Sequence, residues 1–147
     1  MDDTTATPTV GARSTIIYPA LRYVDAPAAI EFLERAFGFS PYAVYKGEDG
    51  SIAHAELELA GAMIMLGSSR DDDLRLVSPK ETGNVTACLY VFVDELDAHY
   101  ARATEAGVDI VRPLADTNYG SREYMARDLE GQLWSFGTYR PGAPASM

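Results

Sequence analysis

The stretches Leu-Arg-Tyr-Val-Asp (residues 21–25) and Val-Phe-Val-Asp-Glu (residues 91–95) each lead into a helical run. The first run ends at Gly38 and the second at Gly107, 69 residues later. Further on, Gly-Ala-Met-Ile-Met-Leu (61–66) is matched at a spacing of 70 by Gly-Gln-Leu-Trp-Ser-Phe (131–136). Similarity at a fixed spacing indicates a duplicated supersecondary module. Neither copy could bury its apolar face alone, so we expect the two to share one sheet, with a site between them.

Length, charge and cysteine content limit the class of protein. The 147 residues are enough for one domain with a sizeable core. A net charge of −10 argues against nucleic acid or an anionic membrane as partner, because both attract basic surfaces. The single cysteine, Cys88, cannot form an internal disulfide, which favours a reducing compartment. No apolar run reaches the roughly 18 residues of a membrane span. We therefore expect a cytoplasmic protein.

The chain divides into two modules joined by a polar connection. Residues 67–84 are rich in Ser and Asp, and they fit either a solvated linker or a lid. The helices are expected from Asp25 to Phe37 and from about Leu96 to Ala106, with strands around them. The expected divisions are a disordered lead (1–13), a single domain (14–139) with modules at about 14–66 and 85–139 around the linker (67–84), and a tail (140–147).

The doubled order of motifs resembles the vicinal oxygen chelate superfamily, which contains glyoxalases, bleomycin-resistance proteins and extradiol dioxygenases. The segments that carry the resemblance are 21–25, 29–33, 37–39, 91–98 and 127–134. The last, Arg-Asp-Leu-Glu-Gly-Gln-Leu-Trp, is similar to the family's Asp-Pro-x-Gly-Asn turn. The resemblance implies an α+β fold in which two βαβββ modules form one curved, open eight-stranded sheet around a central cleft. It also implies a homodimer.

Enzymes of this family hold a divalent metal with two side chains from each module, typically His and Glu. Carried over to this chain, the four positions are Tyr18, Met65, Cys88 and Ser135. A phenol, a thioether, a lone thiol and a hydroxyl make a poor site for such a metal. We therefore expect neither a metal nor another cofactor.

The period of two along a strand predicts which side chains line the cleft. If the four family positions point inward, Arg22 and Tyr90 point inward with them. Arg122 is expected near the mouth of the cleft, either in a surface salt bridge or as an anchor for a ligand. Cys88 is expected to behave as a small buried hydrophobe.

The two histidines of the chain have different expected positions. His54 lies on a strand that alternates apolar and polar residues, and it is the candidate for acid–base chemistry. A histidine hydrogen-bonded at the sheet surface is the alternative. His99 lies on the second helix, where it should face outward or pack against the back of the sheet.

Three classes of function remain open. The first, which we favour, is metal-free binding of a flat, largely apolar molecule, as in the bleomycin-resistance branch, for antibiotic self-protection or metabolite carriage. The second is a metal-independent lyase or isomerase that uses His54 or a tyrosine. The third is a lyase or dioxygenase with an unorthodox metal site. The sequence does not identify the ligand, show turnover, or decide whether a dimer exchanges modules.

Overall fold

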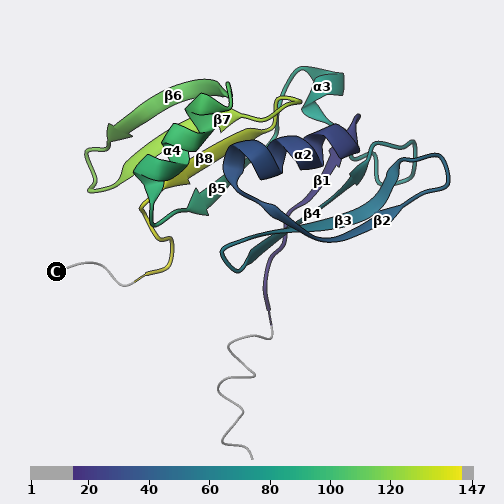
Figure 1. The fold of residues 1–147 in the computed structure, drawn as a ribbon, viewed down its shortest axis with the longest axis horizontal. Coiled ribbons are helices and arrows are strands. Elements are labelled where there is room, and N and C mark those ends of the chain that lie inside the picture. The colour runs from purple at the N-terminus through teal and green to yellow at the C-terminus, as the bar shows by residue number, and fades with distance from the viewer. Residues whose placement is uncertain (1–14, 144–147) are drawn as a thin grey trace, which may run out of the picture.

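The computed structural model describes residues 15–143, so the expected lead and the end of the expected tail lie outside the described residues. The chain follows the order strand, helix and three strands twice, with a short helix between the copies (Figure 1). The elements are β1 (Ala20–Tyr23), α2 (Ala26–Phe37), β2 (Ser40–Lys46), β3 (Ile52–Leu59), β4 (Ala62–Ser68), α3 (Pro79–Thr82), β5 (Cys88–Phe92), α4 (Leu96–Glu105), β6 (Asp109–Asp116), β7 (Arg122–Arg127) and β8 (Leu133–Gly137).

The α+β class with two βαβββ modules is confirmed, but hydrogen bonding divides the strands into two sheets. The first has the order β1-β4-β3-β2 and the second β5-β8-β7-β6, so each sheet has four strands. Ala20 pairs with Met65 and Tyr90 with Ser135, positions that differ by 70 in both cases. The repeat in the sequence therefore corresponds to a repeated strand pairing: β1 pairs with β4 in the same register as β5 pairs with β8. β1 and β5 are edge strands of their own sheets, so the continuous eight-stranded sheet that we expected is replaced by two sheets of four.

Local sequence fixes both ends of α2. The Asp25 side chain accepts a hydrogen bond of 3.2 Å from the Ala28 N–H, which satisfies one of the free donors of the first turn. A proline in the first turn has no N–H to leave unpaired. At the other end Gly38 has a φ of 86°, a left-handed conformation that glycine adopts without strain. The helix therefore begins and ends where the sequence predicts.

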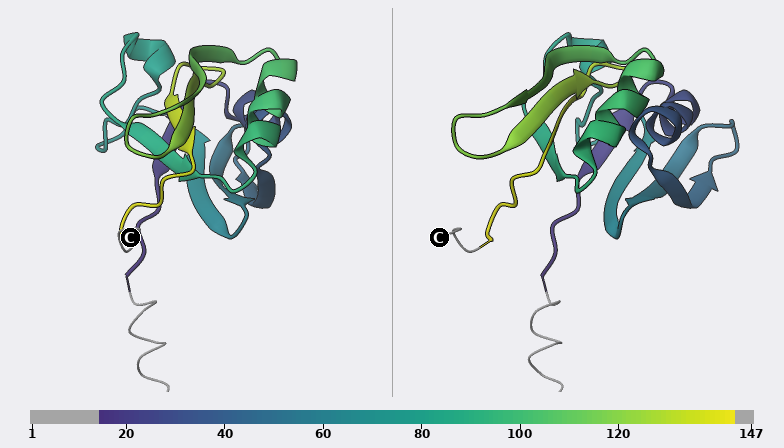
Figure 2. Two further views of the ribbon diagram at one scale, coloured as in Figure 1. Left: turned by 90° about the vertical axis from the view of Figure 1, so that its left-hand side faces the viewer. Right: turned by 60° about the vertical axis from the view of Figure 1, so that its left-hand side comes forward.

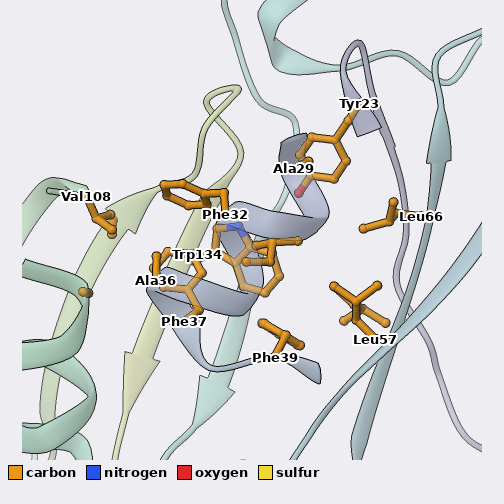
Figure 3. Packing of buried hydrophobic residues seen from close by; sticks show 14 of the residues in the cluster. Tyr23, Ala29, Phe32, Ala36, Phe37, Phe39, Leu57, Leu66, Val108 and Trp134 are labelled. Carbon is orange, nitrogen blue, oxygen red and sulfur yellow. The ribbon is translucent and has the colours of Figure 1, made fainter. Parts of the chain in front are cut away.

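α2 packs against both sheets and so joins the modules in one core. Toward its own sheet it covers Leu57 and Leu66, and toward the other module Phe37 contacts Trp134 (Figure 3). Phe37 also contacts Phe136. The ring centroid of Phe37 lies 5.7 Å from that of Trp134 and 4.8 Å from that of Phe136. All five side chains are almost completely buried. Trp134 thus packs between sheet and helix, as predicted from its place next to Ser135 on a strand, where neighbouring side chains point to opposite faces.

The shared core decides where the other sides of the sheets point. α2 and α4 lie side by side between the two sheets, as the right-hand view of Figure 2 shows. Because the helices cover one side of each sheet, the opposite sides face away from the core. We call these the first open face (His54, Glu56, Glu58, Met63, Met65) and the second open face (Cys88, Tyr90, Met125, Leu133, Ser135).

A buried carboxylate in the turn between β7 and β8 ties the modules together. Asp128 Oδ2 accepts a hydrogen bond of 2.5 Å from the Tyr23 hydroxyl of the first module and one of 3.1 Å from Trp134 Nε1. Asp128 Oδ1 accepts the N–H groups of Glu130 and Gln132, each at 3.0 Å. Burial raises the pKa of Asp128, and burial together with Asp128 raises that of Tyr23. This turn is the part of the sequence that resembles the family's Asp-Pro-x-Gly-Asn motif.

The same turn holds a second buried carboxylate. Glu130 Oε1 accepts the Val24 N–H at 2.7 Å and the Ser78 hydroxyl at 2.6 Å, and Oε2 accepts the Asp25 N–H at 2.8 Å. Ser78 belongs to the linker and is fully buried. The linker is therefore fastened to both modules at this point, so it is not wholly solvated.

α4 supplies two further links to the first module. His99 Nε2 donates a hydrogen bond to the Phe37 carbonyl at 2.8 Å, because a carbonyl can only accept. Nδ1 of the neutral ring therefore accepts a hydrogen bond from the Tyr124 hydroxyl at 2.6 Å. Burial lowers the pKa of His99 and keeps the ring neutral. Arg102 donates to the carbonyls of Glu34 and Arg35, which lie at the open end of α2. His99 thus packs against the back of the sheet, one of the two expected positions.

No helix in the described range 15–143 has the length and apolarity needed to cross a membrane.

The junction predicts a large effect for Glu130→Ala. This substitution leaves the buried hydroxyl of Ser78 and the partly buried N–H groups of Val24 and Asp25 without their acceptor, and a buried group without a partner costs about 1–3 kcal/mol. We expect a loss of about 3 kcal/mol in the free energy of unfolding, measured by urea denaturation. Glu48→Ala, in an exposed turn, is the matched control and should change it by less than about 0.5 kcal/mol. Similar values for both variants would contradict the proposed role of the junction.

Candidate functional site

A groove of about 1100 Å³ runs between the edges of β1 and β5, where the two modules meet. Its walls come from the segment around β1, from the turn between β3 and β4, and from β5 with the residues that follow it. Phe39 and His99 reach the groove from the helix side. The lining residues are 16–21, Phe39, 59–64, 87–95, His99 and Gln132.

The groove is mostly apolar and aromatic, with few charged groups. Tyr18 and Phe92 line it and are 45% and 38% exposed, which is high for aromatic side chains. Its carboxylates are those of Asp94 and Glu95, and its lining contains no lysine or arginine. A pocket of this composition suits a flat organic molecule, and its charge favours a cation over an anion.

Three of the residues predicted for the cleft line this groove: Tyr18, Cys88 and Tyr90. Tyr18 precedes β1, and Cys88 and Tyr90 lie on the second open face. The hydroxyl of Tyr90 donates to the Tyr139 carbonyl at 2.6 Å, which holds the ring across the end of β8. Gly137 leaves the space for that ring, because a Cβ there would lie 2.7 Å from the Tyr90 hydroxyl.

Met65 and Ser135 lie deeper on the two open faces and do not line the groove. Met65 pairs with Ala20 of β1 and Glu56 of β3, and Ser135 pairs with Tyr90 and Met125. They occupy corresponding positions in the two sheets. The four family positions therefore divide two and two between the modules, Tyr18 with Met65 and Cys88 with Ser135.

The chemistry of these four side chains does not fit the metal that the family implies. Thioether and phenol oxygen are weak ligands for Zn²⁺, Ni²⁺, Fe²⁺ or Mn²⁺. Partial burial of the Cys88 thiol raises its pKa, which favours the protonated form over the thiolate that binds metals. Among residues 15–143, no group of three or more His, Cys, Asp and Glu side chains is arranged to hold a metal ion.

Two predicted cleft residues lie elsewhere and have partners of their own. Arg22 is 6% exposed and its Nη2 contacts Asp72 Oδ2 at 2.9 Å, so the linker covers it. The Arg22 guanidinium lowers the pKa of Asp72. Arg122 contacts Asp97 Oδ1 at 3.0 Å and Asp116 Oδ1 at 2.8 Å. Asp97 belongs to α4, so Arg122 points to the helix side and forms the surface salt bridge that was the alternative in the sequence.

The exposure of Cys88 differs from the expected burial, since its residue is exposed at the start of β5. It is the first residue of an edge strand, so one flank has no neighbouring strand to cover it. The expectation that Cys88 is a small buried hydrophobe is therefore wrong.

His54 lies on the first open face, away from the groove. Its Nε2 is 3.0 Å from Glu56 Oε2, and its ring stacks on that of Tyr45 with centroids 6.1 Å apart. Side chains two apart on a strand share one face, so the pair follows from local sequence. His54 is therefore a hydrogen-bonded histidine at the sheet surface, which was one expectation. Its carboxylate partner Glu56 is also compatible with the other expectation, acid–base chemistry.

Sequence reasoning missed Phe39, His99 and Gln132 as groove residues. Phe39 follows α2 and packs on Trp134 at 5.6 Å, a contact between modules that no local pattern contains. Gln132 stands at the asparagine place of the family's turn, and that equivalence was the one signal in the sequence that marked it.

A comparison with protein families matches residues 15–136 to the Glyoxalase/Bleomycin resistance protein/Dioxygenase superfamily. Among proteins, the chain is 31% identical over 125 residues to the uncharacterized protein Mb0911c of Mycobacterium bovis, covering 81% of this chain and 80% of that protein. It has the same identity to the uncharacterized protein Rv0887c of Mycobacterium tuberculosis, covering 81% of this chain and 71% of that one.

Solved structures show the same architecture. TioX from Micromonospora sp. ML1 is 34% identical, has a TM-score of 0.68, and is matched over 90% of this chain and 100% of its own. UcmS2 has a TM-score of 0.69 at 16% identity over 86% of this chain and 99% of its own, which supports the fold alone. The family match spans both modules and both open faces. The chain therefore belongs to the Glyoxalase/Bleomycin resistance protein/Dioxygenase superfamily.

Proposed function

We propose that this protein binds a flat, largely apolar small molecule without a metal, as a sequestering or carrier protein of the bleomycin-resistance type. The observation that carries the proposal is the groove of about 1100 Å³, with Tyr18, Tyr90 and Phe92 on its walls. The uncharged donor set at the four family positions supports binding in place of metal chemistry. The single cysteine supports a reducing compartment such as the cytoplasm.

The lining gives several weak contacts that act together. Stacking on one aromatic ring contributes roughly 0.5–1.5 kcal/mol beyond the burial of area. Met63, near the turn between β3 and β4, adds a polarizable thioether that adapts to the outline of a ring system. A ligand that touches several of these side chains would combine the contributions.

Charge favours a cationic ligand. Asp94 and Glu95 line the groove, and the whole chain carries a net charge of −10. Arg22 and Arg122, the residues that could have reversed the local sign, are each paired with aspartates outside the groove. A planar cation should therefore associate faster than its neutral analogue, and the difference should fall with added salt.

The direction of the open faces supports a homodimer. Within one chain the two faces point away from a shared core, so they do not enclose a ligand between them. A twofold dimer would bring the first open face of one copy opposite the second open face of another. It would also cover Ile17, which is 91% exposed, and the free edges of β1 and β5.

A second candidate function is metal-independent turnover as a lyase or isomerase. One observation favours it, the contact of 3.0 Å between His54 Nε2 and Glu56 Oε2. A carboxylate that orients an imidazole is the usual arrangement for proton transfer. In a dimer that joins open faces, this pair would face the ligand from the opposite wall.

Tyr18→Ala tests the ligand. In a thermal-shift screen of planar antibiotics, dyes and aromatic metabolites, we expect hits whose affinity this substitution weakens roughly three- to tenfold, the loss of one stacking contact. Tyr42→Ala is the matched control, since Tyr42 is exposed on β2 and outside the groove. If Tyr18→Ala leaves every hit unchanged while His54→Ala abolishes turnover of a substrate, the protein is an enzyme and sequestration is wrong.

Elemental analysis tests the metal. Protein purified without chelator should contain well under one equivalent of Zn, Ni, Fe or Mn, because the donor set at Tyr18, Met65, Cys88 and Ser135 binds these ions weakly. Finding one tightly bound ion per chain, lost on mutation of these residues, would replace the binding proposal by metal-dependent catalysis.

Sedimentation equilibrium tests the dimer. At micromolar concentration the mass should be about twice the 16.0 kDa of the chain. Ile17→Asp should shift the equilibrium toward monomer, because it introduces a charge beside the proposed interface. Leu129→Asp, at an exposed turn position elsewhere, should not. A wild-type protein that remains monomeric throughout would contradict the dimer.

A further inference from the structure

A second cavity, of about 310 Å³, lies beneath the linker between the modules. Its walls are the β1 strand, the linker residues that include Leu76 and Val77, and the segment 84–87 that enters β5. The cavity and the groove share the lining residues Ala20, Leu21, Ala87 and Gln132. The two spaces therefore adjoin at these residues, Gln132 lines both, and we call the second space the inner compartment.

The side chain of Gln132 is held in one orientation. It is 8% exposed, and its Nε2 donates to the Ala87 carbonyl at 3.1 Å and the Leu133 carbonyl at 3.3 Å. Only the nitrogen of an amide side chain can donate a hydrogen bond to a carbonyl. The atom that contacts the two carbonyls is therefore Nε2, and the other end of the amide is Oε1. Within residues 15–143, no group donates a hydrogen bond to Oε1 of Gln132. The amide therefore offers a fixed, unused acceptor in a mainly apolar setting.

We propose that Gln132 determines the specificity of the groove, and that the ligand is a flat molecule with an N–H or O–H donor that reaches Gln132 Oε1 while an apolar branch enters the inner compartment. This inference rests on the proposed function, because it specifies the ligand of the same groove. It adds a polar requirement to a site that is otherwise described by stacking alone.

The polar groups near Gln132 favour a ligand with a neutral hydrogen-bond donor over a ligand with a carboxylate. Arg22 lines the inner compartment, but its charge is matched by Asp72 at 2.9 Å, so the compartment has no free cation to hold a carboxylate. A ligand without a donor would remove water from Gln132 Oε1 and leave the oxygen unpaired. Leaving a buried acceptor unpaired costs more than an ordinary hydrogen bond gains.

The proposal is tested with pairs of ligands in which a ring N–H group in one member is replaced by a ring oxygen atom in the other. We would measure dissociation constants by calorimetry for carbazole and dibenzofuran, acridone and xanthone, and indole and benzofuran. Each pair keeps shape and planarity and changes one donor. The wild-type protein should bind the N–H member roughly three- to tenfold more tightly. Gln132→Met, which keeps the length of the side chain and removes the acceptor, should bring this ratio close to one.

For each variant, the ratio of the two dissociation constants within a ligand pair distinguishes a loss of donor recognition from a general loss of folding or binding. Gln132→Met also loses the contact to the Ala87 carbonyl, so both affinities can fall together, but a general loss leaves their ratio unchanged. Asn118→Ala, at an exposed amide outside both cavities, is the control and should keep the wild-type ratio.

The outcomes distinguish this inference from the proposed function. Equal binding of both members of each pair by the wild type, with no effect of Gln132→Met on the ratio, overturns the role of Gln132 and leaves the binding function intact. A preference for the N–H member that survives Gln132→Met also overturns it. Failure of all six compounds to bind contradicts the proposed function, and the inference falls with it.

Discussion

Two carboxylates in the turn between β7 and β8 hold the modules in their relative position. Asp128 accepts one hydrogen bond from the Tyr23 hydroxyl in the first module and one from the Trp134 indole in the second. Glu130 accepts hydrogen bonds from two backbone N–H groups just before α2. Buried acceptors of this kind are stable only when every partner is present, so small displacements of one module are costly. The core that joins α2 to Trp134 and Phe136 forms under this constraint.

The position of the site follows from that arrangement. With the helices between the sheets, the edges of β1 and β5 approach each other without joining, and the groove occupies the space between them. The linker, fastened at Ser78, covers the space beyond Gln132, where Arg22 lines the inner compartment and is paired with Asp72. The same contacts that stabilise the fold thus remove positive charge from the groove and leave an apolar lining with one oriented amide.

The proposed binding function depends on side chains at particular positions of the shared scaffold. Two of the positions that the resemblance assigns to metal ligands, Met65 and Ser135, lie at the same register of the two sheets. What differs is the chemistry of the side chains there. TioX shares the architecture of this chain, and an architecture of this kind does not by itself determine function.

The sequence by itself determined the repeated module, the ends of α2 and the burial of Trp134, because these depend on spacing, capping and periodicity within short segments. The spacing of 70 in the sequence also corresponds to a shared register of strand pairing in the two sheets. Only the tertiary structure decided that the sheets are two and that Arg22 and Arg122 are paired with aspartates. It also decided that Cys88 is exposed and that Phe39, His99 and Gln132 line the groove. Those features depend on how the modules pack against each other and on where the linker crosses β1. Contacts between residues far apart in the chain leave no periodic trace in the sequence around them.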